Sequence, residues 1–164
     1  MAHDWVYLDT NIFIALRETN GVENKLLWDI LASLRNKARP FQTSLLTFSE
    51  LKVRPLRLRE AAVLATYEEW SQSNDWPQVC TVSRSVLEGA ALLRAHKASL
   101  KLPDAIHLAT ALHLRCRYFL TADQGIQDIS VLEHPVEGML DIQPLVVLRP
   151  DEPTLTALLE SLAS

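Results

Sequence analysis

Short apolar runs alternate along the chain with longer segments in which apolar residues recur every three or four positions. The first run, residues 5–8, is rich in β-favouring residues and lacks polar alternation, which is typical of a parallel strand buried on both faces. The runs that we expect to form strands lie at residues 5–8, 41–45, 78–82, 117–121 and 145–148. Their alternation with helical segments predicts an α/β fold, with a mostly parallel central sheet of four or five strands covered by helices on both faces.

The segments between these runs carry helix signals. Thr47 stands three residues before Glu50, which predicts a capping box, and Ser83 or Ser85 introduces another helix. Pro103 opens a helix that is apolar around most of its circumference, so this helix should pack on several sides. We expect helices at residues 12–17, 23–38, 58–72, 86–97, 103–116 and 154–164, and one beginning at residue 47.

Composition narrows the class of protein. A chain of 164 residues, 48% hydrophobic and 22% charged, suits one globular domain. It has no apolar run of the roughly 18 to 20 residues that cross a bilayer and no secretory leader pattern, so we expect a cytoplasmic protein with Cys80 and Cys116 reduced. The net charge of −4 gives no global attraction for nucleic acid, so such a role needs a local basic patch.

Four acidic residues fall where a parallel sheet presents its ligand-binding edge. Asp9 ends the first expected strand, Glu50 follows the second, Asp123 follows the fourth, and Asp104 lies in the first turn of the most apolar helix. Ligands of open α/β sheets bind outside the carboxyl ends of the strands, so these acids are expected to lie together. Each acid could instead have an ordinary structural role. Asp9 could cap the helix that follows it and Glu50 could complete a capping box. Asp104 could complement a helix dipole, and Asp123 could be a turn residue.

Close carboxylates repel one another and require a counter-charge. The segments that carry these acids contain no Lys or Arg of their own, so a bound cation is the simplest solution. A site of carboxylates, Asn11 and water suits Mg²⁺ or Mn²⁺ better than zinc, which prefers histidine and thiolate ligands. Such ions activate water and polarise phosphoryl oxygens, so this chemistry indicates phosphodiester hydrolysis.

The segments YLDTNIF, TFSEL, LPDAIHLATAL and FLTAD, in this order, resemble the signature segments of PIN-domain ribonucleases, and most closely the VapC-like toxins of type II toxin–antitoxin pairs. The resemblance covers residues 5–148. It implies a PIN-like α/β/α sandwich, Mg²⁺- or Mn²⁺-dependent endoribonuclease activity on RNA, a homodimer and a cognate antitoxin. We therefore expect a PIN domain at 1–148 and a C-terminal helical extension of the same domain at 149–164.

The resemblance also assigns residues. The acids of the family, catalytic and metal-binding, fall on Asp9, Glu50, Asp104 and Asp123. Of the polar residues after the first acid, Thr10 and Asn11, Asn11 is expected to orient the acidic cluster. Thr121 occupies a Ser/Thr position whose hydroxyl could hold water or the scissile phosphate. Ile126 departs from the family, where an aromatic residue is common, and this change should alter packing only.

Two basic groups flank the acids and are candidates for binding the RNA backbone. Lys52 and Arg54 follow Glu50 directly, and a second group leads into Asp104; either could equally be a solvated helix face. His107 lies one turn after Asp104, but a histidine on a buried helix is more often a hydrogen-bonded core residue, so we assign it no catalytic role. The second group consists of Arg94, His96, Lys97 and Lys101.

Three other functions remain open. A housekeeping PIN nuclease would process RNA without an antitoxin, and a non-catalytic PIN-type module would only bind. A phosphate-accepting receiver also gathers acids at strand ends, but it needs paired acids after the first strand and a lysine after the last. VYLDTNIF has one acid and LVVLRPDEP has no lysine, so the receiver is disfavoured.

Overall fold

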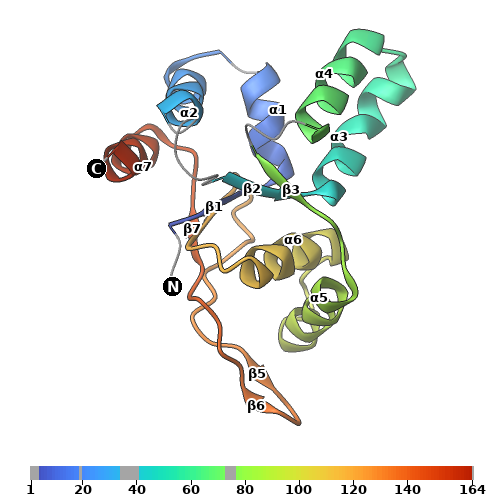
Figure 1. Cartoon of the computed structure of the whole chain (residues 1–164), viewed down its shortest axis with the longest axis vertical. Helices are drawn as coiled ribbons and strands as arrows, with labels where there is room; N and C mark the ends of the chain where they lie inside the picture. Colours follow the sequence, from blue (N-terminus) through green and yellow to red (C-terminus); the bar gives the residue numbers. More distant parts are fainter. Residues whose placement is uncertain (1–3, 19, 34–40, 73–76, 164) are drawn as a thin grey trace.

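The apolar runs form a five-stranded parallel sheet. A computed structural model describes residues 4–18, 20–33, 41–72 and 77–163. The strand order is β3-β2-β1-β4-β7, so β1, the first strand in sequence, lies at the centre of the sheet (Figure 1). Each neighbouring pair is parallel, as predicted, and the strands are β1 (Val6–Leu8), β2 (Phe41–Ser44), β3 (Gln78–Cys80), β4 (Tyr118–Leu120) and β7 (Val146–Leu148).

Helices cover both faces of this sheet and give three layers, α/β/α. Val6 and Leu8 pack into one core, whereas Tyr7 packs into the other, because successive strand residues point to opposite faces. The first core is built by α1 (Thr10–Glu18), α2 (Val22–Ser33), α3 (Leu45–Leu58), α4 (Ala61–Gln72) and α7 (Glu152–Ala163). The second core is built by α5 (Arg84–His96) and α6 (Leu102–His113) (Figure 1).

Helix α3 begins earlier than the sequence pattern predicts. Ser44 is its N-cap, and the Ser44 hydroxyl accepts a hydrogen bond from the backbone N–H of Leu46. The predicted capping box of Thr47 and Glu50 is therefore wrong, since Thr47 lies inside the helix with its hydroxyl 2.7 Å from that of Thr43. This correction leaves the Glu50 carboxylate free for other contacts. At α5 the cap is Ser83, one of the two candidates.

An antiparallel hairpin of β5 (Glu133–His134) and β6 (Gly138–Met139) projects beyond α5 and α6 (Figure 1). Its strands are too short to give a recognisable pattern in the sequence. Near the C-terminus, α7 buries Leu155, Leu158 and Leu162 in the first core, against α2.

The helix predicted at 23–38 corresponds to α2, which the structure describes up to Ser33. The rest of the predicted range lies outside the described residues. Both cysteines are free thiols. Within the part of the chain that the structure describes, no helix combines the length and apolarity needed to cross a membrane.

Candidate active site

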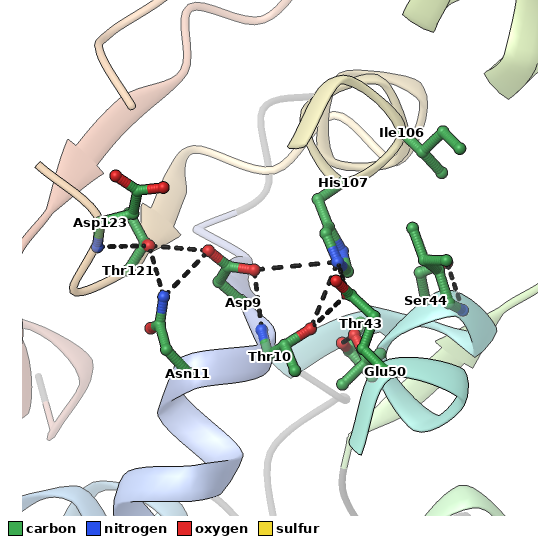
Figure 2. Close-up of polar contacts among 12 residues, drawn as sticks. Asp9, Thr10, Asn11, Thr43, Ser44, Glu50, Ile106, His107, Thr121 and Asp123 are labelled. Carbon is green, nitrogen blue, oxygen red and sulfur yellow. Dashed lines mark hydrogen bonds and ion pairs between the residues drawn. The ribbon is translucent and has the colours of Figure 1, made fainter. Parts of the chain in front are cut away.

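Asp9 occupies the centre of a polar cluster at the carboxyl end of β1. It is only 6% exposed, and its backbone N–H donates to the carbonyl of Leu120, which ties it to the end of the neighbouring strand β4. Its Oδ1 accepts from the backbone N–H of Thr10 at 2.8 Å. Its Oδ2 accepts from the hydroxyl of Thr121 at 2.7 Å and from the amide of Asn11 at 3.2 Å (Figure 2). The carboxylate is therefore held by donors on both oxygens.

Thr121 and Asn11 connect Asp9 to the loop that carries Asp123. The Asn11 Nδ2 donates to Thr121 Oγ1 at 3.0 Å, and the Asn11 Oδ1 accepts from the backbone N–H of Ala122 at 2.9 Å. Thr121 Oγ1 also accepts from the backbone N–H of Asp123 at 3.0 Å. Because its proton goes to Asp9, the Thr121 hydroxyl orients that acid in this structure. The exposed Asp123 carboxylate closes the loop by accepting from the N–H of Gly125 at 2.8 Å.

Glu50 approaches the other side of Asp9 from α3. Its Oε1 accepts from the Thr10 hydroxyl at 2.7 Å and lies 2.5 Å from Nε2 of His107 (Figure 2). His107 Nε2 also lies 3.8 Å from Asp9 Oδ1, so the imidazole stands beside both acids. Burial alone would raise the pKa of Glu50, but the hydrogen bonds from His107 and Thr10, together with the charge of His107, outweigh it and lower that pKa.

Asp104 completes the set of acids from the first turn of α6, one turn before His107. Its pKa is raised, first by burial and then by the negative charges of Asp123, Asp9 and Glu50, against which His107 acts. Each of the other three acids thus acts electrostatically on Asp104. Among the described residues, no Lys or Arg forms an ion pair with any of the four carboxylates.

The fold is that of a known family. A sequence model of the PIN domain matches residues 6–132, which is most of the chain. The chain belongs to the PIN domain family. The matched range includes all four acids and ends at Leu132, just before the hairpin of β5 and β6.

Several solved structures have a fold similar to that of this chain. A toxin–antitoxin complex from Klebsiella pneumoniae is 25% identical over 90% of this chain and 98% of that chain, with a TM-score of 0.53. VapC20 of Mycobacterium tuberculosis, described as a sarcin–ricin-loop-cleaving toxin, is 17% identical over 70% and 86%, with a TM-score of 0.56. VapBC2 of Rickettsia felis, bound to a promoter DNA fragment, is 13% identical over 72% and 87%, with a TM-score of 0.59. No curated protein sequence matches the chain significantly.

The basic residues expected near this PIN site differ in their pairing. Lys52 Nζ lies 2.6 Å from a carboxylate oxygen of Glu68, and Arg54 lies 3.1 Å from Glu18, so both are paired with acids of neighbouring helices. In the second basic group, Lys97 reaches the loop after β4 and donates to the carbonyl of Gly125 at 3.1 Å.

The donor chemistry of the PIN site fits a hard divalent cation, because its ligands would be carboxylate oxygens. Burial raises the pKa of Asp104 most and the negative charges of the other acids raise it further, and a bound cation would offset that negative charge. As placed, however, no three His, Cys, Asp or Glu side chains of the described ranges are arranged to hold a metal ion. Asp104 is half-buried and Asp123 is exposed, so neither side chain is enclosed by packing as that of Asp9 is.

Two residues of this site are not assigned to it by the sequence pattern, His107 and Tyr7. His107 is a buried hydrogen-bonded histidine, only 1% exposed, yet its Nε2 faces Glu50 and Asp9. Tyr7 looks like an ordinary strand residue, but its hydroxyl lies 2.7 Å from Nδ1 of His107. The one available signal was the spacing of three between Asp104 and His107, which places both on one face of a helix.

Proposed function

We propose that the chain is an Mg²⁺- or Mn²⁺-dependent endoribonuclease and the toxin of a type II toxin–antitoxin pair. The observation that carries this proposal is that Asp9, Glu50, Asp104 and Asp123 follow strand ends and helix starts at one edge of a PIN-domain sheet, where burial and the charges of the other three acids raise the pKa of Asp104. An RNA phosphodiester is the substrate class that such a cation-demanding acidic site suits.

In this proposal the four acids hold the cation, which when bound would supply Lewis acidity and charge neutralisation at the phosphate. The residues around the acids keep them in place. Thr121 and Asn11 hold Asp9 Oδ2, and the Thr10 hydroxyl holds Glu50 Oε1, so neither carboxylate has to be ordered when substrate arrives. Such preorganisation favours catalysis because little reorganisation remains at the moment of reaction.

Binding of the RNA backbone is assigned to the basic residues beside the acids. Lys52 and Arg54 would exchange Glu68 and Glu18 for phosphates, so their contribution is reduced by the ion pairs that must break. We further propose a homodimer in the cytoplasm that a cognate antitoxin neutralises. The likeness to the toxin–antitoxin complex from Klebsiella pneumoniae, which extends over 90% of the chain, supports the toxin over a housekeeping nuclease.

The test is to express the chain with and without the product of the neighbouring gene, then to map RNA cleavage by the purified protein. We expect growth arrest that the neighbour relieves, and cleavage with Mg²⁺ or Mn²⁺ that EDTA abolishes, leaving 5′-phosphate and 3′-hydroxyl ends. Asp9→Asn should abolish both effects. Cleavage without toxicity or neutralisation would identify a housekeeping nuclease, and RNA binding without cleavage would identify a binding module.

A further inference from the structure

His107 is a buried polar residue that joins the central strand of the sheet to the acidic edge. Its ring lies on α6 with Nδ1 2.7 Å from the Tyr7 hydroxyl. Nε2 lies 2.5 Å from Glu50 Oε1 (Figure 2). Thr110, a buried polar neighbour on the same helix, bonds back to the carbonyl of Ile106 in its own turn. His107 instead uses both ring nitrogens on other elements, β1 and α3.

The direction of these hydrogen bonds follows from the partners. An ionised carboxylate can only accept, so Nε2 must carry a hydrogen and donate it to Glu50. In the neutral ring, Nδ1 then accepts from the Tyr7 hydroxyl. The Tyr7 hydroxyl lies 2.7 Å from Nδ1 and has one proton to donate to it. Partners of this kind fix which ring nitrogen is protonated.

Tyr7 is the rigid anchor of this arrangement. Its ring is fully buried on β1 and stacks on Phe119 of the adjacent strand, with centroids 5.0 Å apart and an interplanar angle of 9°. A glutamate on a helix has several rotatable bonds and, unrestrained, would sample several rotamers. His107 and Thr10 together engage Oε1 of Glu50, and among the described residues no hydrogen bond engages Oε2.

We propose that Tyr7 and His107 form a positioning pair, in which the sheet-anchored hydroxyl aligns the imidazole and the imidazole fixes the Glu50 carboxylate with Oε2 directed away from the pair. The role of Glu50 toward a cation and RNA rests on the proposed function. The geometric role of the pair does not, and it can be measured in metal-free protein. Outer hydrogen-bond partners of this kind typically change metal affinity or activity by about 10- to 100-fold when removed.

The experiment compares variants that remove the hydrogen bonds of the pair together or singly. His107→Leu deletes both ring nitrogens at similar volume, and His107→Gln keeps an N–H near the position of Nε2. Tyr7→Phe deletes only the hydroxyl and keeps the stack on Phe119. His113→Gln is the matched control, because His113 is an exposed histidine on the same helix. Thermal melts establish that each variant is folded.

Four measurements are made, and those other than the NMR of the His107 ring are made on every variant. Ring ¹⁵N NMR of metal-free protein should show His107 protonated at Nε2 in the wild type. Crystal structures without metal should show one Glu50 rotamer in the wild type and a displaced or multiply placed carboxylate in His107→Leu. Mn²⁺ calorimetry and RNA cleavage should show a loss of roughly 10- to 100-fold in affinity or kcat with KM unchanged, because the pair does not touch RNA. His107→Gln should recover most of that loss, and Tyr7→Phe should fall between it and His107→Leu.

The outcomes separate the two proposals. If wild-type protein binds no Mn²⁺ and cleaves no RNA, the proposed function fails, while the NMR and crystallographic measurements still decide the pair. A His107 ring without a proton on Nε2, or a Glu50 carboxylate placed identically in His107→Leu, would overturn the positioning role. Wild-type Mn²⁺ affinity and kcat in His107→Leu, in an active enzyme, would overturn it as well.

Discussion

Replacing Asp9 with asparagine tests the hydrogen bonds and the charge of the site in one variant. An asparagine has one acceptor oxygen, whereas Asp9 has two acceptor oxygens that together accept from three donors. If the oxygen keeps the position of Oδ2, it still accepts from Thr121 and Asn11, and the amide nitrogen then faces the N–H of Thr10 at 2.8 Å. The opposite orientation is worse, because it leaves the Thr121 proton without an acceptor. Asn11 cannot flip to compensate, since its oxygen already accepts from Ala122.

The least costly orientation therefore loses one hydrogen bond to a charged group, worth about 1.5–3 kcal/mol. Removing the charge also relieves the repulsion on Asp104, a gain limited to about 1 kcal/mol because such groups are partly screened by solvent. We expect Asp9→Asn to be folded but less stable by about 0.5–2 kcal/mol, which lowers the Tm by roughly 1–8 °C for a domain of this size.

Guanidinium unfolding in EDTA measures this loss, and RNA cleavage measures the second expectation, that activity disappears. Asp141→Asn is the control, because the side chain of Asp141 is 89% exposed and should tolerate the change within about 0.5 kcal/mol. Equal unfolding free energies for Asp9→Asn and Asp141→Asn would refute the hydrogen-bond reasoning. Wild-type cleavage by folded Asp9→Asn would refute the catalytic assignment of Asp9.

Three further predictions concern pH, RNA binding and the C-terminal helix. The pKa of Glu50 is lowered in the folded state, so its charge stabilises the protein above the unfolded pKa and this is lost as pH falls through the folded value. The pKa of Asp104 is raised, so its stabilising effect is complete below the unfolded pKa and is lost as pH rises through the folded value. In EDTA at pH 7, Glu50→Gln should therefore unfold at lower denaturant than wild type and Asp104→Asn at higher, both differences shrinking in acid; the same sign for both would contradict the electrostatic account. Lys52→Ala should raise KM for RNA and reduce the salt dependence of binding by about 0.7 in the log–log slope if one phosphate contact to a single strand is lost, and an unchanged slope would remove Lys52 from the RNA site. Leu155→Ala should cost about 2–5 kcal/mol by leaving a cavity under α7, whereas Val136→Ala on the exposed hairpin should be nearly neutral; a cost near zero for Leu155→Ala would show that α7 does not stabilise the domain.

The sheet could be predicted from the sequence because its strands are buried on both faces. Residues 5–8 and 118–120 are continuous apolar runs, and such runs occur where a strand has no solvent side. Helix ends were predicted less well, because competing caps lie close together. Ser44 takes the cap that the Thr47 pattern suggested, and α3 continues through Pro55 to Leu58, where Arg59 adopts a left-handed conformation with φ of 56°. Local patterns do not determine which of two neighbouring caps the tertiary structure uses.

The candidate site could be predicted as a set of acids but not as a network. The sheet topology brings residues at the carboxyl ends of the strands to one edge, whatever direction their side chains take. The orientation of His107 depends on where Tyr7 places its hydroxyl, a contact between residues separated by 100 positions. A buried histidine has the same local signature whether it faces a carboxylate or a backbone carbonyl, so periodicity cannot distinguish the two.

Adjacent residues after Asp9 show how the fold connects distant acids. Thr10 donates from its hydroxyl to Glu50, 40 positions along the chain, while Asn11 donates to Thr121, 110 positions along. The two side chains leave the first turn of α1 in different directions, so one reaches α3 and the other reaches the loop after β4 (Figure 2). Asp9 lies between them and accepts from the backbone of one and the side chain of the other. The three consecutive residues Asp9, Thr10 and Asn11 therefore set the relative positions of acids on separate elements, and substitution of either Thr10 or Asn11 would release one side of the cluster while leaving the other held.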